Sequence, residues 1–157
     1  MRRLLMTLLL LGSLSAAGAS DAKPAAPSGS VVKVLPLLLD LKGHDATSPS
    51  LFDRDAYQFY LRIHTNDVSA VRFDVLWSAS HTATNELKLR VELRGYDTNS
   101  LPCQTVLEQI VTPHFFRHWT SLTLGGDDYK NFGEAVAWRA TLWSGDRMIG
   151  EQKSFLW

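Results

Sequence analysis

The segment Glu86–Arg94 constrains the fold of this chain more than any other stretch. Within it, the apolar residues Leu87, Leu89, Val91 and Leu93 alternate with charged ones. Successive side chains of a strand point to opposite faces, so this alternation predicts a strand with one buried and one exposed face. Sheets with one solvated face are typical of antiparallel proteins. We therefore expect a mainly β, antiparallel protein.

Six further segments carry weaker or similar strand patterns. The same period of two recurs over 71–78 and 136–143, and Ser144–Arg147 supplies turn residues for a hairpin after the second of these. The other expected strands are 31–41, 104–112, 119–124 and the final run 148–157, whose aromatic residues lie toward the chain end. Pro36 has no backbone N–H to donate to a neighbouring strand, so we expect the strand over 31–41 to lie at a sheet edge. Seven strands in one domain predict two packed sheets, an all-β sandwich.

One connection does not read as a strand. Ser50 is placed to cap a helix, and Asp53 follows in the first turn. The apolar residues of the segment recur at helical spacing: Phe52, Ala56, Phe59, Tyr60 and Ile63. The pattern predicts a short amphipathic helix over about 50–63. A strand over 56–63 is the alternative.

Two aromatic residues carry a resemblance to a known class of domain. Trp77 ends an expected strand, and Tyr129 lies in 126–133, a predicted helical turn that folds Tyr129 and Phe132 inward. These residues resemble the core tryptophan and the tyrosine corner of immunoglobulin-like and fibronectin type III-like domains. The resemblance implies an immunoglobulin-like β-sandwich, although the paired cysteines are missing and a helix is added. The whole pattern is also similar to small exported bacterial proteins, which implies no activity.

The N-terminus has the layout of a secretory signal. Arg2 and Arg3 precede the short apolar run Leu4–Leu14, and the small residues Ala17 and Ala19 suit a signal peptidase. We expect a signal peptide over 1–19, a flexible linker over 20–30, and a sandwich domain over 31–157. The run is too short to span a bilayer. We therefore expect an exported protein, periplasmic or secreted, with no membrane insertion after signal cleavage.

The charge argues against a nucleic-acid partner, and the cysteine content excludes an internal disulfide. Removing residues 1–19 takes away two of the 16 basic residues and none of the 16 acidic ones, which leaves a net charge of −2. Nothing here is basic enough to predict a nucleic-acid partner. Cys103 is the single cysteine, so no internal disulfide can form. We interpret it as a small, inert side chain near the start of a strand.

Patterns for metal binding and catalysis are weak. His114 and His118 are four residues apart, but in an extended segment that spacing separates them by roughly 13 Å. No third ligand accompanies them, so we expect no metal and no cofactor. Adjacent acids such as Asp127 and Asp128 read as solvated turn residues rather than as a facing catalytic pair. We expect no enzymatic activity.

Aromatic residues offer the most suggestive functional pattern. Phe115, Phe116 and Trp119 gather with His118 in one connection between strands, and strand alternation points Trp143 outward. Aromatic rings beside polar groups suit sugar stacking or a protein interface. The alternative is that the loop aromatics fold back and close one end of the core.

We therefore predict an exported, monomeric, non-catalytic binding or accessory module of the cell envelope. It would recognise a protein partner or a glycan through these aromatic residues or through an edge strand. One alternative is a hydrolytic enzyme that uses a carboxylate and a histidine, such as Asp55 with His64. Another is a structural subunit that assembles through its edge strands.

Overall fold

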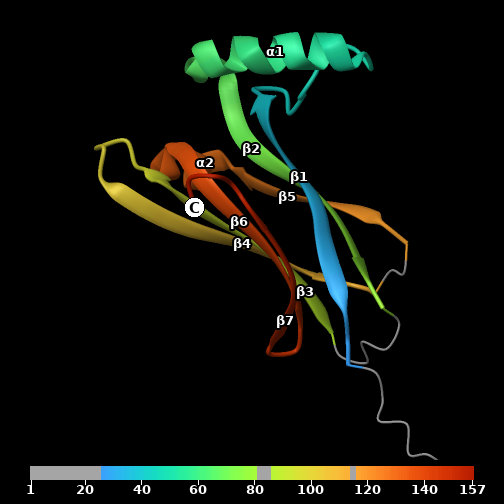
Figure 1. Ribbon diagram of the computed structural model, residues 1–157. Coiled ribbons are helices and arrows are strands. Elements are labelled where there is room, and N and C mark those ends of the chain that lie inside the picture. Colours follow the sequence, from blue (N-terminus) through green and yellow to red (C-terminus); the bar gives the residue numbers. More distant parts are fainter. Residues whose placement is uncertain (1–25, 81–85, 114–115) are drawn as a thin grey trace, which may run out of the picture.

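The computed structural model describes residues 26–80, 86–113 and 116–157 (Figure 1). The expected signal peptide over 1–19 lies outside the described residues. In chain order, the described elements are β1 (Gly29–Asp40), α1 (Leu51–Ile63), the 3₁₀ turn η1 (Thr65–Asp67), β2 (Val68–Ala79), β3 (Leu87–Tyr96), β4 (Pro102–Val111), β5 (His118–Gly125), α2 (Gly126–Phe132), β6 (Glu134–Ser144) and β7 (Arg147–Lys153).

The strands form two antiparallel sheets. Three strands pair in the order β1-β2-β5, and four pair in the order β4-β3-β6-β7. The chain crosses between the sheets after β2, β4 and β5. The predicted seven-stranded antiparallel sandwich with one helix near 50–63 is confirmed. So is the edge position of β1, where Pro36 pairs opposite Phe73 and, among the described strands, only β2 is hydrogen-bonded to β1 in the sheet.

The core lies between the two sheets and follows from the alternation of the strands. From Val71 onward in β2, and throughout β3, every second side chain points inward and is buried, whereas the residues between them are partly or fully exposed. Trp77 is fully buried, and its Nε1 donates a hydrogen bond to Thr120 Oγ1 at 2.9 Å. Each large apolar side chain buried in this way contributes about 1.5–3 kcal/mol to folding.

The two lateral sides of the sandwich differ. On one side β1 approaches β7 so closely that a Cβ added to Gly150 would lie 3.0 Å from the backbone of Ser30. A side chain at this position would require the Ser30 backbone to shift by a few tenths of an ångström, so glycine suits the close approach. On the other side, β4 and β5 border a shallow hollow between the sheets.

Both helices lie in connections between strands. Ser50 caps α1 by accepting a hydrogen bond from the backbone N–H of Asp53, which confirms the predicted helix and excludes a strand over 56–63. In Figure 1, α1 lies across one end of the sandwich, at the top of the view. The predicted turn over 126–133 is the helix α2, in which Phe132 is buried and Tyr129 packs against the core.

The end of the chain differs from the prediction. β7 stops at Lys153, and residues 154–157 form a turn rather than the last part of a strand. Ser154 exchanges hydrogen bonds with the backbone of Trp138, which ends the regular ladder. The Trp157 ring then lies 3.9 Å from the Arg94 guanidinium, and Phe155 is fully exposed. A cation–π contact at the surface, not the core, holds the terminal tryptophan.

Candidate functional site

Most of the predicted binding residues lie where β4 connects to β5. Phe115 falls outside the described residues. Phe116 is 81% exposed, and Trp119 is 46% exposed on the outer face of β5. His118 lies on the inner face of β5, where its ring meets the buried Trp77 edge-on, with centroids 6.1 Å apart. Phe116 and Trp119 therefore do not close the end of the core.

A hollow of about 220 Å³ lies beside this group. It is lined by Trp77 of β2 and by residues of β4 and β5, among them Gln109, Val111, His118 and Thr120. The hollow is shallow and mixed in polarity. Its described lining offers hydrogen-bonding groups from Gln109, His118 and Thr120, and none of these described lining residues is a carboxylate.

The structure does not bring Trp143 to this group. Trp143 lies on β6 in the other sheet, opposite Lys88 and Met148 in the register. It points outward as predicted, yet it is half-buried, and its Nε1 donates to Thr141 Oγ1 at 2.9 Å. Trp143, the second candidate, therefore lies on a different sheet from Trp119.

The histidine and carboxylate of the enzymatic alternative are not joined either. Asp55 lies 3.8 Å from the Arg54 Nε, whereas His64 follows the end of α1 and stacks on the Tyr60 ring with centroids 4.0 Å apart. Nine residues along a helix correspond to about 13 Å. A proton could not pass directly between groups at that separation.

Metal-binding clusters and membrane-spanning helices are absent from the part of the chain that the structure describes. Within it, no three His, Cys, Asp or Glu side chains converge where they could hold a metal ion. Neither of the two described helices combines the length and apolar composition needed to cross a membrane.

Helix α1 carries a group of exposed apolar side chains on one side. Phe52 is 81% exposed, Phe59 is 63% exposed and Ile63 is 61% exposed, and Ala56 between them is also exposed. At 100° per residue, these four side chains fall within about 60° of one another around the helix axis. We call them the outer stripe. An amphipathic helix normally buries such a stripe against its own core.

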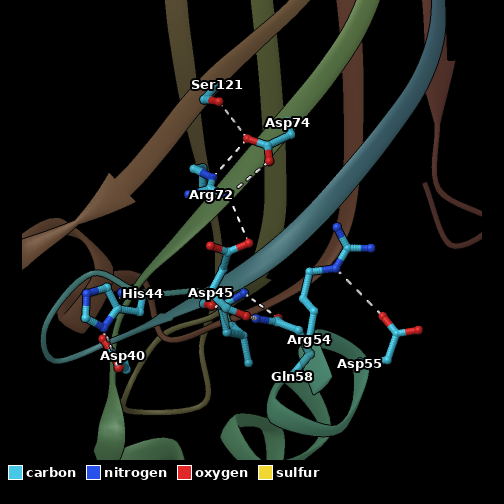
Figure 2. Close-up of polar contacts among 10 residues, drawn as sticks. Asp40, His44, Asp45, Arg54, Asp55, Gln58, Arg72, Asp74 and Ser121 are labelled. Carbon is cyan, nitrogen blue, oxygen red and sulfur yellow. Dashed lines mark hydrogen bonds and ion pairs between the residues drawn. The ribbon is translucent and has the colours of Figure 1, made fainter. Parts of the chain in front are cut away.

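The opposite side of α1 contacts the sandwich. Gln58 and Leu61 are the buried residues of the helix, and Leu61 is fully buried. The Gln58 side chain accepts from Leu38 N–H at 2.8 Å and donates to the carbonyl oxygens of Leu38 and Asp45, both at 2.9 Å (Figure 2). The amide thus pairs with the free edge of β1 as another strand would. Because this polar anchor faces inward, the outer stripe must face solvent.

A second contact fixes α1 at the end of β1. The Tyr57 hydroxyl donates to Asp40 Oδ2 at 2.8 Å, and Asp40 Oδ1 accepts from the backbone N–H groups of His44 and Lys42. The His44 N–H, above all, lowers the pKa of Asp40, with help from Tyr57 and Lys42 against partial desolvation. The hydrogen bond to Asp40, in turn, raises the pKa of Tyr57. A charged Asp40 and a protonated Tyr57 therefore stabilise the same joint.

A charge network ties the loop before α1 to the outer face of the three-stranded sheet. Figure 2 shows Arg72 between Asp45 and Asp74, at 3.2 Å and 2.9 Å, with the Ser121 hydroxyl also donating to Asp74 at 2.6 Å. Every carboxylate in this network has a partner. These contacts hold the loop, and thereby α1, against the sheet.

Sequence reasoning found the stripe but not its direction. The helical spacing predicted an apolar side made of Phe52, Ala56, Phe59, Tyr60 and Ile63, whereas nothing marked Gln58 as an inward anchor. Tyr60 lies beside the outer stripe, and its hydroxyl donates to Asp67. Glutamine is mostly exposed in proteins, so its burial depends on the β1 edge that it meets in the fold.

Comparisons of the chain with protein-family models, with curated proteins and with solved structures found no match. Function must therefore be inferred from the geometry of the chain itself.

Proposed function

We propose that this protein is an exported, non-catalytic binding module of the cell envelope, and that α1 is its main docking element for a protein partner. One observation carries the proposal: the outer stripe of α1 points directly away from the sandwich. Phe52, Phe59 and Ile63 expose apolar area that folding alone gives no reason to leave in water.

The attachment of α1 supports a protein-binding role. The helix is held by the buried Gln58 and Leu61 and by the Tyr57–Asp40 hydrogen bond. A helix fixed in this way loses little conformational freedom when a partner binds. Apolar side chains at spacings of four and seven residues are the anchors that a helix uses to bind a groove or another helix.

A paired set of variants tests this proposal. Phe52→Ala with Phe59→Ala removes the stripe, and Phe116→Ala with Trp119→Ala removes the aromatic pair near β5. Each form would be crosslinked in an envelope extract, and the captured proteins quantified against the wild type. We expect the first variant to lose a specific partner and the second to keep it. Equal capture by all three forms would contradict docking through either surface.

The aromatic pair near β5 carries a second candidate function, recognition of a glycan. Phe116 and Trp119 are exposed, and a hollow with polar walls lies alongside. Sugar rings stack on exposed aromatic faces and bind polar groups beside them. Loss of binding to envelope glycans in the Phe116→Ala, Trp119→Ala form, with retention in the stripe variant, would favour this function.

The proposal includes an immunoglobulin-like or fibronectin type III-like identity for the sandwich. Support comes from the three-plus-four arrangement of antiparallel strands and from Tyr129 in the β5–β6 connection, where such domains have a tyrosine corner. Trp77 lies on the second strand, whereas the core tryptophan of immunoglobulin domains lies on the third. Domains of this class commonly serve as binding modules, and the site must supply the specificity.

A further inference from the structure

We propose that the outer stripe of α1 binds the same stripe of a second copy of this chain, with the two helices antiparallel. This inference rests on the proposed docking role of α1 and names the partner. The sandwich lies on the side of the helix where Gln58 and Leu61 are buried, so the outer stripe faces away from it and is open to a second copy (Figure 1).

The first argument is the match between side chains in the stripe. Phe52, Ala56, Phe59 and Ile63 follow spacings of four, three and four residues, which are the d-a-d-a positions of a coiled-coil heptad. In an antiparallel pair, a residues face d residues. Phe52 then faces Ile63 of the second copy, and Ala56 faces Phe59. A small residue opposite a large one fills the space evenly in each layer.

The second argument is charge complementarity beside the stripe. Asp55 and Arg62 occupy the two g positions of this heptad, and both are exposed. In an antiparallel pair, g residues face g residues, so Asp55 of each copy meets Arg62 of the other. The two-fold symmetry produces this ion pair twice. Pairs at e and g positions set the partner and the direction of coiled coils.

A parallel pair would lose both features. Ala56 would face Ala56 and leave a gap, and Asp55 would face Tyr60 instead of a cation. Parallel helices also align their dipoles, whereas antiparallel helices oppose them. The antiparallel arrangement is therefore the one that this sequence favours.

The helix pair is short, so the dimer is weak. Four side chains per copy give an interface below the roughly 1,200 Å² that stable complexes bury. We expect a dissociation constant on the order of 10–100 μM. The protein would therefore be monomeric in dilute solution and would dimerise where it is concentrated or held at a surface.

Charge-swap variants test the arrangement directly. In Asp55→Arg, two arginines face each other at each contact, and in Arg62→Asp two aspartates do. Sedimentation equilibrium of the purified protein, up to about 500 μM, should show each single variant dimerising about tenfold more weakly than the wild type. Asp55→Arg combined with Arg62→Asp should restore dimerisation. Asp127→Arg, a matched change on the exposed surface of α2, should have no effect.

Mixing the two single variants gives the sharpest result. In an antiparallel heterodimer, each contact again joins an arginine to an aspartate, so an equimolar mixture should associate like the wild type. A parallel helix pair or an edge-strand contact does not produce this rescue. Loss of dimerisation in Phe52→Ala, Phe59→Ala would further support the stripe as the interface.

A wild type that stays monomeric at about 500 μM would overturn this inference, as would a dimer indifferent to Asp55 and Arg62. Neither result touches the proposed docking function if the stripe variant still loses a specific partner in the crosslinking experiment. If the wild type dimerises and the stripe variant retains all its other partners, the result supports self-association. It contradicts docking of a different protein through the outer stripe.

Discussion

The sandwich and helix α1 treat apolar residues in opposite ways. In β2 and β3 the alternating apolar side chains point inward, and Trp77, Leu89 and Val91 are fully buried. In α1 the apolar stripe points outward, and the buried side contains Gln58 and Leu61. The alternation in the strands therefore predicts correctly which side chains are buried. The helical spacing in α1 predicts only that one side of the helix is apolar, not that this side is buried.

The contrast has a physical cause. A strand between two neighbours can expose either face, but only the apolar face gains free energy when the second sheet covers it. Helix α1 meets the edge of β1, where unpaired N–H and C=O groups need partners. An amide satisfies the backbone of Leu38 better than an apolar side chain would. Hydrogen-bond demand at the edge thus decided which side of α1 faces the protein.

The largest effect is expected inside the sandwich. Trp77→Ala removes a fully buried ring and its hydrogen bond to Thr120, which should lower the free energy of unfolding by about 3–5 kcal/mol. Urea unfolding followed by circular dichroism would measure it. Trp119→Ala, at an exposed position, is the control and should cost less than about 1 kcal/mol. Similar losses for both would break the distinction between inward and outward rings.

The second prediction concerns the polar anchor of α1. Gln58→Ala leaves the N–H and C=O of Leu38 without their side-chain partner, and we expect a loss of about 1–3 kcal/mol. In the Gln58→Ala variant, the backbone amides of α1 should also exchange with deuterium faster than those of β2.

Gln58→Glu sharpens this test. The carboxylate can still accept from Leu38 N–H, but it would face the carbonyl oxygens of Leu38 and Asp45 that the amide now donates to. We expect a destabilisation at neutral pH that is partly relieved when the carboxyl is protonated and can donate. A fully stable Gln58→Glu form would show that the anchor is not needed to orient the helix.

The third prediction is a pH dependence at the joint between Tyr57 and Asp40. The pKa of Asp40 is lowered in the folded protein, so its contribution to stability is present above about pH 4 and is lost as the pH falls through the folded value. The pKa of Tyr57 is raised, so its contribution is present below about pH 10 and is lost as the pH rises through the folded value.

Tyr57→Phe isolates this contact. The stability difference between the wild type and Tyr57→Phe should be constant from about pH 5 to 9 and should shrink below about pH 4. Urea midpoints at each pH would measure it, because all other carboxylates titrate alike in both proteins. A difference that persists unchanged to pH 2.5 would contradict a role for charged Asp40.

The smallest effect is expected on the outer stripe. Phe59→Ala should change the free energy of unfolding by less than about 0.5 kcal/mol, because the ring is mostly in water and alanine favours the helix. The measurement belongs near 1 μM protein, where a weak dimer does not contribute. A loss above about 1 kcal/mol would mean that the stripe supports the fold rather than a partner.

Much of the fold followed from local patterns. Alternation over 86–94 and 71–78 predicted buried strand faces, Pro36 predicted an edge strand, and Ser50 predicted the start of a helix. Each of these depends on short-range geometry that the chain carries with it. The predicted final strand extends too far, to Trp157. Local patterns could not reveal its end, because the contact of Trp157 with Arg94 joins residues far apart in the sequence.

The candidate site divides in the same way. The sequence by itself placed Phe116 and Trp119 close together along the chain, and predicted that Phe52, Ala56, Phe59 and Ile63 share one side of a helix. The structure assigns Trp119 to β5 and leaves Phe116 in the connection before it. Only the tertiary structure separated Trp143 from the other aromatic residues, because β5 and β6 belong to different sheets. The tertiary structure also decides that the outer stripe faces solvent. The free edge of β1 binds Gln58, so the side of α1 that carries Gln58 faces the sandwich and the stripe lies on the other side.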